Sequence, residues 1–289
     1  MNSKETPAKP VQVLLAPKYL LYTGKILTAI SPFIASRFAA RLFLTPYKYK
    51  LPKREREMDS NTLQETITIP SINREVVVYH YGKSPQKILL AHGWSGTGTQ
   101  MAVIAKALKE KGFSTISFDA PAHGKSPGKI SMMPFFIHTI AHLAKVYGPF
   151  HAAIGHSLGG MSLLKNVKDG VHFNKLVIIG TANSVTHITK HFAQNMNLNE
   201  KVAAKMKSYF DSKFGEDMDN YSGAISSEAV NIPTLVIHDE DDVDVHVSSA
   251  IAIDNALENS ELMITQRLGH RKILGDQEVI NKITTFIAV

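Results

Sequence analysis

Beyond residue 60, the chain alternates short apolar runs with amphipathic stretches of helical periodicity. Two runs rich in Ile and Val, 65–70 and 75–81, flank a short turn and predict an opening β-hairpin. The strands that follow alternate with helices, so we predict an α/β fold with a mainly parallel central sheet and helices on both faces. Further strands are expected at 87–91, 114–118, 150–154, 176–179, 234–237 and 261–265, with helices ending at 111, covering 133–146 and beginning at 158 and 276.

The connection between the strands at 176–179 and 234–237 is unusually long. It holds about fifty residues of polar helical sequence, whereas ordinary connections have roughly two to six residues. We therefore predict that residues 184–231 form a small helical lid inserted into the domain. The side chains of this segment that are available as a pocket lining are His191, Phe192, Met196, Tyr209 and Phe210.

An apolar segment punctuated by basic residues precedes this domain. Its longest uncharged run, 26–36, has 11 residues, whereas a helix that spans a bilayer needs roughly 20. A secretory signal is not expected either, because ten mostly polar residues come first, Lys25 interrupts the apolar part and Pro32 divides it. The pattern predicts one or two amphipathic helices that split near Pro32. Their apolar positions are Leu20, Leu21, Ile26, Leu27, Ile30, Phe33, Ile34, Phe38, Leu42 and Phe43.

The composition is that of a globular protein, since 44% of the 289 residues are hydrophobic and 20% are charged. Cysteine is absent, which excludes disulfides, thiolate metal sites and cysteine nucleophiles. The net charge of +7 would ordinarily suggest nucleic acid or an anionic membrane as a partner. However, residues 1–57 contain eleven Lys and Arg and three acidic residues, so the remainder has a net charge of −1. We predict a basic amphipathic extension, 1–57, and a near-neutral domain, 58–289, with a charged linker at 53–59 where the two meet.

Two interpretations of the extension are open. Its helices dock on the main domain and roof the active site, or they make peripheral membrane contact through residues 11–56, with basic residues against anionic headgroups. Nucleic acid is not expected as a partner, because no helix-turn-helix, zinc or aromatic RNA-binding motif accompanies the basic stretch 48–56. The expected location is cytoplasmic, and under the second interpretation also peripheral to a membrane.

The stretch most informative about chemistry is Gly155-His-Ser157-Leu-Gly159-Gly160, which follows an apolar strand and precedes a helical pattern. A sharp turn from strand to helix strains the serine backbone, and the glycines let strand and helix approach closely while the hydroxyl stays exposed. The helix N-terminus beneath the serine also stabilises negative charge. This context predicts a nucleophile elbow with Ser157 as the catalytic nucleophile.

A serine hydroxyl needs a base to take its proton and a carboxylate to orient that base. His270 follows the last predicted strand, and a run of carboxylates follows the strand at 234–237, so both lie at carboxyl ends of strands, where α/β sheets place their sites. The same run with His238 and His246 is an alternative site for a divalent cation. A solvated acidic loop explains it more simply, and we expect no metal. The carboxylates are Asp239, Glu240, Asp241, Asp242 and Asp244.

These motifs resemble those of the α/β-hydrolase family, from about residue 65 to the C-terminus. Residues 92–96, HGWSG, resemble the oxyanion loop of the family, and residues 118–126, FDAPAHGKS, resemble its Asp-x-Pro-Gly-x-Gly-x-Ser turn. The elbow and the Gly-His pair at 269–270 complete the resemblance. Ala122 stands where the family usually has glycine, and we expect this difference to alter only a surface turn.

The resemblance implies roles for five residues. Ser157 would attack a carbonyl carbon, and His270 would act first as general base and then as general acid. Asp242 would orient the imidazole and stabilise its charged form. The backbone N–H groups of Trp94 and Leu158 would form the oxyanion hole, in which the loss of one donor costs about 3 kcal/mol.

The choice of Asp242 as the acid rests on the family pattern His-Gly-x-x-Asp-x-x-Val. This pattern aligns with His238, Asp239, Asp242 and Val245, although Asp239 replaces the glycine. The alternatives that stay open are Asp239, Asp241 and Asp244.

The implied function is a serine hydrolase that cleaves a small-molecule carboxylic ester or thioester through an acyl-enzyme intermediate, without a metal or organic cofactor. Peptidase and acyltransferase chemistry stay open, because they share the same triad. A different class of function, a non-catalytic binding protein with this fold, also stays open. The complete Ser-His-Asp set argues against it, since a binding protein has no need of it.

Overall fold

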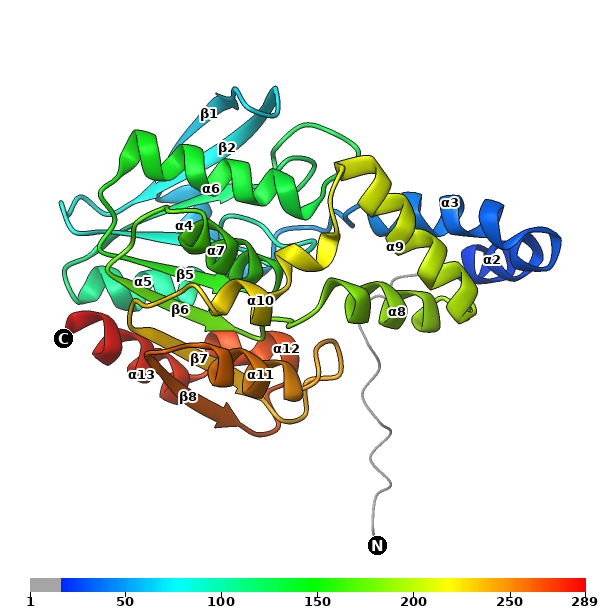
Figure 1. Ribbon diagram of the computed structural model, residues 1–289. Helices are drawn as coiled ribbons and strands as arrows, with labels where there is room; N and C mark the ends of the chain where they lie inside the picture. Colours follow the sequence, from blue (N-terminus) through cyan, green and yellow to red (C-terminus); the bar gives the residue numbers. More distant parts are fainter. Residues whose placement is uncertain (1–16) are drawn as a thin grey trace, which may run out of the picture.

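The computed structural model describes residues 17–289, and its centre is a sheet of eight strands (Figure 1). The strands are β1 (Leu63–Ile69), β2 (Arg74–Tyr81), β3 (Lys87–Ala91), β4 (Ser114–Asp119), β5 (Ala152–His156), β6 (Lys175–Ile179), β7 (Thr234–Asp239) and β8 (Ser260–Thr265). Their spatial order is β1-β2-β4-β3-β5-β6-β7-β8. The pairs β1–β2 and β2–β4 are antiparallel and the other pairs are parallel, so the predicted mainly parallel sheet is confirmed.

Helices cover both faces of the sheet (Figure 1). They are α2 (Lys18–Ile30), α3 (Pro32–Phe43), α4 (Lys53–Ser60), α5 (Ala102–Glu110), α6 (Met133–Tyr147), α7 (Leu158–Lys168), α8 (Val185–Asn195), α9 (Glu200–Phe214), α10 (Gly223–Ser227), α11 (Ser248–Ala256), α12 (Gly269–Lys272) and α13 (Gln277–Ala288), with short 3-10 turns at Met218–Tyr221 and Ile273–Gly275. Helices α6, α7 and α11 pack on one face, and α4, α5 and α13 pack on the other.

The central strands bury side chains on both faces. In β3, Leu89 packs with the α6–α7 layer and Leu90 packs with the α5–α13 layer. In β6, Ile178 packs with the α6–α7 layer and Val177 packs with the α5–α13 layer. Two covered faces explain why these strands are continuous apolar runs in the sequence, without the alternation of a sheet that has one side in water.

The N-terminal helices pack on the helical insertion, residues 184–231. Pro32 occupies the first helical position of α3, where its missing N–H is not needed, so the chain divides there as predicted. Helix α3 contacts α9, and α9 contacts α8, so all three share one apolar cluster in which Ala35 and Ala39 are fully buried. Figure 1 shows α2, α3, α8 and α9 grouped beyond one end of the sheet. Residues 11–16 of the predicted amphipathic segment lie outside the described residues.

None of the helices within residues 17–289 combines the length and the apolar character needed to cross a bilayer.

The charged linker expected at 53–59 is wrong, because these residues belong to helix α4. Glu55 and Met58 lie three positions apart, so they share one helix face, and both are buried. The Glu55 carboxylate accepts hydrogen bonds from the hydroxyls of Thr97 and Thr99, at 2.9 and 3.0 Å. The expected boundary between residues 57 and 58 therefore falls inside a helix that packs on the sheet domain.

Replacing Met58 with Ala should lower the free energy of unfolding by about 2–4 kcal/mol, because it leaves a cavity under α4. Leu63→Ala is the matched control, since the side chain of Leu63 is 72% exposed and that of Met58 is 2% exposed. Chemical denaturation followed by circular dichroism measures both. A Met58→Ala effect as small as that of the control would contradict the packing of α4.

Candidate active site

Ser157 lies at the turn between β5 and α7, with φ of 53° and ψ of −117°. Its amide donates a hydrogen bond to the carbonyl of Ile179 at 2.8 Å, which holds this strained conformation. A Cβ atom on Gly155 would lie 2.6 Å from the Cα of Gly160, so only glycine permits the close approach of strand and helix. The turn thus has the conformation that the motif predicts for an exposed nucleophile.

A histidine and a carboxylate from two other strand ends meet beside this turn. His270 Nδ1 lies 2.7 Å from Asp242 Oδ2, and the Asp242 side chain is almost completely buried. The other oxygen of this carboxylate accepts from the amides of Asp244 and Val245, both at 2.9 Å. The Asp242 carboxylate is therefore held by the backbone, and the imidazole that donates to it leaves Nε2 available.

The loop after β3 lies against the serine. A Cβ atom on Gly93 would lie 3.1 Å from that of Ser157, and the Gly93 amide donates to Gln100 Oε1 at 2.9 Å. Trp94 follows Gly93 and lines the same cavity as Ser157. Leu158 is the first residue of α7, so its amide has no acceptor within the helix. The two predicted oxyanion donors thus come from segments adjacent to the serine.

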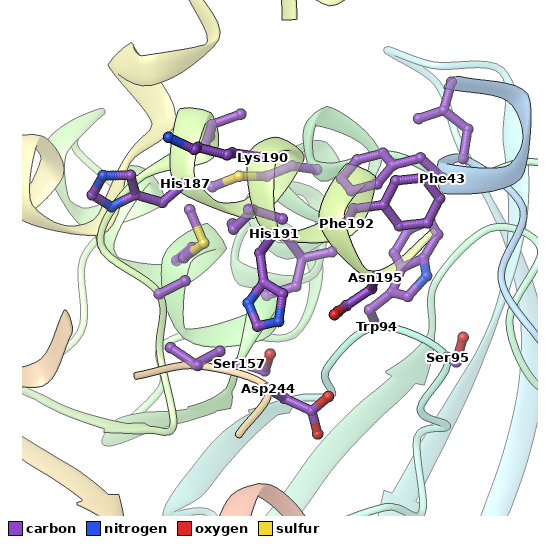
Figure 2. Close-up of a pocket in the computed structure, with 18 of the residues that line it drawn as sticks. Phe43, Trp94, Ser95, Ser157, His187, Lys190, His191, Phe192, Asn195 and Asp244 are labelled. Carbon is purple, nitrogen blue, oxygen red and sulfur yellow. The ribbon is translucent and has the colours of Figure 1, made fainter. Parts of the chain in front are cut away.

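A cavity of about 850 Å³ extends from Ser157 and His270 to the N-terminal helices. Its walls come from the loops at the carboxyl edge of the sheet on one side and from α2, α3, α8 and α9 on the other. Figure 2 shows Ser157 on one side of this space and the aromatic side chains of Phe43 and Phe192 across it. Most of the lining is apolar; it includes Leu20, Phe43, Met133, Met161, Ile188 and Phe210.

Solved structures share this fold. An esterase from Pyrococcus furiosus superimposes with a TM-score of 0.65 at 17% identity, covering 85% of this chain and 96% of its own. Bromoperoxidase from Bacillus anthracis (TM-score 0.62, 17% identity) and an esterase from Exiguobacterium antarcticum (TM-score 0.61, 16% identity) each cover 78% of this chain and all of their own. The family described as serine aminopeptidase, S33, matches residues 82–221. No functionally curated protein has a matching sequence.

The chain has the α/β-hydrolase fold.

The fold predicted for this α/β-hydrolase is thus confirmed, and its departures from the family pattern have structural explanations. Asp239 replaces the glycine after His238, and its carboxylate accepts from the Gly269 and Leu268 amides at 2.8 and 3.1 Å and from the Thr265 hydroxyl at 2.8 Å. Burial raises the pKa of Asp239, but these hydrogen bonds outweigh it, so the pKa lies below its ordinary value. Asp239 therefore fastens the loop that carries the histidine to the end of β7.

The expectation that Ala122 lies in a surface turn is wrong. Ala122 is 1% exposed and has a φ of +66°, a left-handed conformation that favours glycine. Its amide donates to the Pro127 carbonyl at 2.9 Å, which closes the turn inside the protein. Alanine replaces the family glycine at the cost of backbone strain.

His156, beside Ser157, contacts two other parts of the site. Its Nε2 lies 2.8 Å from the carbonyl oxygen of His270, 114 positions along the chain, and a Cβ atom on Gly93 would lie 2.7 Å from its Nδ1. Burial, and then the neighbouring His270, hold the pKa of His156 well below its usual range, so the ring is neutral. The Gly-x-Ser-x-Gly motif allows any residue at position 156. The partner of His156 is the carbonyl of His270, and the spacing of residues in the motif does not reveal this contact.

Phe43 connects the N-terminal helices to the loop after β3. Its ring stacks on that of Trp94 with centroids 6.3 Å apart. It also meets Phe192 of α8 and Phe210 of α9, at 5.1 and 5.5 Å. Rings from the extension, the insertion and the sheet domain therefore form one wall of the cavity.

One side chain of the predicted lining points elsewhere. The Tyr209 ring lies under the guanidinium of Arg37 in α3, 4.0 Å from centroid to Cζ. Consecutive helix positions point about 100° apart, so Tyr209 faces α3 while its neighbour faces the cavity. The predicted residues that do line the cavity are His191, Phe192, Met196 and Phe210.

Polar side chains lie at the side of the cavity formed by α8. Figure 2 shows His191 directed toward Ser157 and Asp244, while His187 and Lys190 point away from the serine. The same cavity is lined by His187, Lys190, His191 and Asp244. Of the polar side chains on α8, His191 is thus the one that Figure 2 shows directed toward Ser157.

The histidines of the proposed alternative metal site bind other groups. His238 is completely buried, and its Nε2 lies 2.8 Å from the Val245 carbonyl oxygen. The Nδ1 of His246 lies 2.9 Å from the Ser248 hydroxyl. Within residues 17–289, no group of three or more His, Cys, Asp or Glu side chains is arranged to hold a metal ion.

The free energy of unfolding should fall as the pH is lowered from about 7 to about 5. Four buried histidines, His92, His123, His156 and His238, have pKa values lowered chiefly by burial. The unfolded chain binds protons at these residues below about pH 6.5, whereas the folded chain does not. The contribution of these neutral histidines to the free energy of unfolding is therefore fully present above the unfolded pKa. It is lost as the pH falls toward the folded pKa.

His123→Leu should make this dependence shallower, by up to about 1.4 kcal/mol per pH unit, because one titrating group is removed from the unfolded chain. His172→Leu, at an exposed position, is the control and should keep the wild-type slope. Urea denaturation at several pH values measures the slope. An unchanged slope in His123→Leu would show that this histidine is protonated in the folded protein as well.

Proposed function

We propose that this α/β-hydrolase is a serine hydrolase that cleaves a carboxylic ester or thioester through an acyl-enzyme intermediate. The observation that carries the proposal is the combination of a strained serine and a carboxylate-bound histidine on one cavity. Ser157 and His270 both line this cavity, and Asp242 Oδ2 lies 2.7 Å from His270 Nδ1. The proposed chemistry uses neither a metal nor an organic cofactor.

In the first step, Ser157 Oγ attacks the carbonyl carbon while His270 Nε2 takes the hydroxyl proton. The carbonyl oxygen becomes an oxyanion, which accepts hydrogen bonds from the amides of Leu158 and Trp94. The N-terminal end of α7 adds a favourable partial charge at the same place. Asp242 keeps the imidazole in the tautomer that accepts at Nε2 and stabilises the imidazolium that forms.

In the second step, the bond between the carbonyl carbon and the leaving oxygen or sulfur breaks, and His270 gives its proton to the leaving group. The acyl group stays on Ser157 as an ester. A water molecule then attacks this ester while His270 takes a proton from the water, and the acid leaves as the serine recovers its proton. An acyltransferase would use an acceptor alcohol or thiol in place of that water.

The lining of the cavity supports an apolar acyl group in the substrate. Methionine and aromatic side chains, among them Met133, Met161 and Phe210, line the same cavity as Ser157, and methionine adapts well to flexible chains. A volume of about 850 Å³ lies in the upper range of small-molecule sites. The proposal is therefore a small-molecule ester or thioester with a long apolar acyl chain, and not a nucleic acid.

Peptidase activity is a second candidate, supported by the description of the matching family as serine aminopeptidase, S33. Amino-acid p-nitroanilides distinguish it from esterase activity on p-nitrophenyl esters. A purely binding protein, the candidate of a different class, would turn over neither.

A fluorophosphonate probe should label the wild-type protein and leave Ser157→Ala unlabelled, because the probe reacts with an activated serine hydroxyl. Labelling is read by intact-protein mass spectrometry. Ser162→Ala, a buried serine one turn along α7, is the control and should be labelled like the wild type. A wild type that resists the probe would favour the binding-protein candidate.

The choice among the carboxylates has its own test. Asp242→Asn should lower kcat on the order of a hundredfold or more, because the imidazole loses its orienting partner. Asp241→Asn is the control, since the Asp241 carboxylate accepts from the Arg267 amide at 2.9 Å on the protein surface. Equal losses in the two variants would rule out the assignment of Asp242.

With p-nitrophenyl esters, kcat/KM should rise about two- to fourfold per added methylene until the acyl chain fills the cavity, because each buried methylene contributes up to about 0.8 kcal/mol. Ile188→Trp narrows the cavity and should shift the preference to shorter chains. Ile251→Trp, at an exposed position on α11, should keep the wild-type profile. A flat profile would contradict an apolar acyl site, and parallel assays with acyl-CoA separate thioesters from esters.

A further inference from the structure

The N-terminal helices carry apolar side chains on the face that points away from the rest of the protein. Of the fifteen large apolar side chains that are exposed in residues 17–289, six lie on α2 and α3. Those on α2 recur every three or four positions, so they form one stripe along the helix. This surface, which we call the outer face, consists of Tyr19, Tyr22, Ile26, Ile30, Phe33 and Ile34, each between 46% and 68% exposed.

The opposite side of the same helices is fixed to the enzyme. Gly24 of α2 is buried, and a Cβ atom there would lie 2.9 Å from Leu198 Cδ2, so α2 touches the insertion closely. Leu20 lines the cavity, and Ala35 and Ala39 of α3 are fully buried. One side of these helices is therefore packed on the enzyme. The other side, the outer face, is apolar, and no other part of residues 17–289 covers it.

The charged residues on the two N-terminal helices have one sign. Residues 18–43 contain four basic residues and no acidic residue. Lys18 and Lys25 are exposed on α2 beside the apolar stripe. Arg37 of α3 lies over the ring of Phe33, 4.6 Å from its centroid. Apolar and aromatic side chains bordered by cations are the arrangement with which interfacial helices bind anionic lipid.

We propose that the outer face docks this α/β-hydrolase on an anionic phospholipid bilayer. Helix α2 would lie in the plane of the interface, with Ile26 and Ile30 among the acyl chains and with Tyr19 and Tyr22 at headgroup level. Lys18 and Lys25 would reach the lipid phosphates. A second copy of the chain fits this face poorly, because a two-fold contact would bring together two pairs of helices that carry basic residues and no acidic residue.

The docked orientation places one end of the cavity beside the lipid. Pro17 and Leu20, at the start of α2, line the cavity, while Tyr19 and Tyr22 of the same helix belong to the outer face. An apolar ester leaving the bilayer would therefore meet the cavity at the helix that contacts the membrane. This consequence rests on the proposed function, whereas the docking itself does not.

Vesicle co-sedimentation with the full-length protein tests the docking. Vesicles of phosphatidylcholine alone and of phosphatidylcholine mixed with phosphatidylglycerol supply the neutral and the anionic surface. The wild type should bind the anionic vesicles and bind less as salt is added. The triple variant Tyr22→Ser, Ile26→Ser, Ile30→Ser should bind about tenfold or more weakly, because it loses the apolar contact.

The matched control is Ile251→Ser, Leu262→Ser, Ile264→Ser, which removes three exposed apolar side chains from α11 and β8. It should bind anionic vesicles like the wild type. Hydrolysis of a soluble short-chain ester should be the same in both triple variants, since none of the six positions lines the cavity. Ser157→Ala should bind vesicles normally, so a failure of the proposed function and a failure of docking are separate results.

Three outcomes would overturn the proposal. A wild type that does not bind anionic vesicles excludes the bilayer as the occupant of the outer face. Loss of binding on deletion of residues 2–16, with the outer face intact, assigns the binding to that segment instead. A lipid-free dimer, seen by light scattering, that the outer-face variant abolishes assigns the face to a second copy of the chain.

Discussion

The close contact of β5 with α7 constrains the rest of the site. Gly155 and Gly160 meet at their backbones, with no room for a side chain between strand and helix. This contact sets the direction in which α7 leaves the sheet, and with it the position of Ser157 and of the helix N-terminus behind it. The loop at Gly93 then lies directly against the serine. Backbone packing thus positions the proposed oxyanion donors relative to Ser157, the proposed nucleophile.

The two halves of the cavity are built differently. On the sheet side, hydrogen bonds to buried groups hold the loops: Asp239 binds the amides before His270, and Gln100 binds the amide of Gly93. On the helical side, apolar contacts between α3, α8 and α9 hold the wall, with Phe43 at their centre. Hydrogen bonds thus hold the residues proposed to transfer protons, and apolar contacts that adapt in shape line the proposed acyl site.

The sequence was most informative where local structure determines the result. Glycine spacing and strand order marked Ser157 and His270, and short runs rich in apolar residues located all eight strands. Helix α4 was missed because its buried face holds a charged residue, Glu55, whose partners are more than forty positions away. The burial of Ala122 and the Asp239 contacts were missed for the same reason, since they depend on how distant loops fold together.

Helix α3 ends at Phe43, and its partner α9 begins at Glu200, about 160 residues later. At a synthesis rate of roughly 5–20 residues per second, α3 leaves the ribosome on the order of 8–30 seconds before α9. During that interval, the face of the N-terminal helices that later lines the cavity lacks its partner, and the outer face is not covered by any part of residues 17–289. The growing chain therefore carries a helix pair that is apolar on both sides before the catalytic domain has folded.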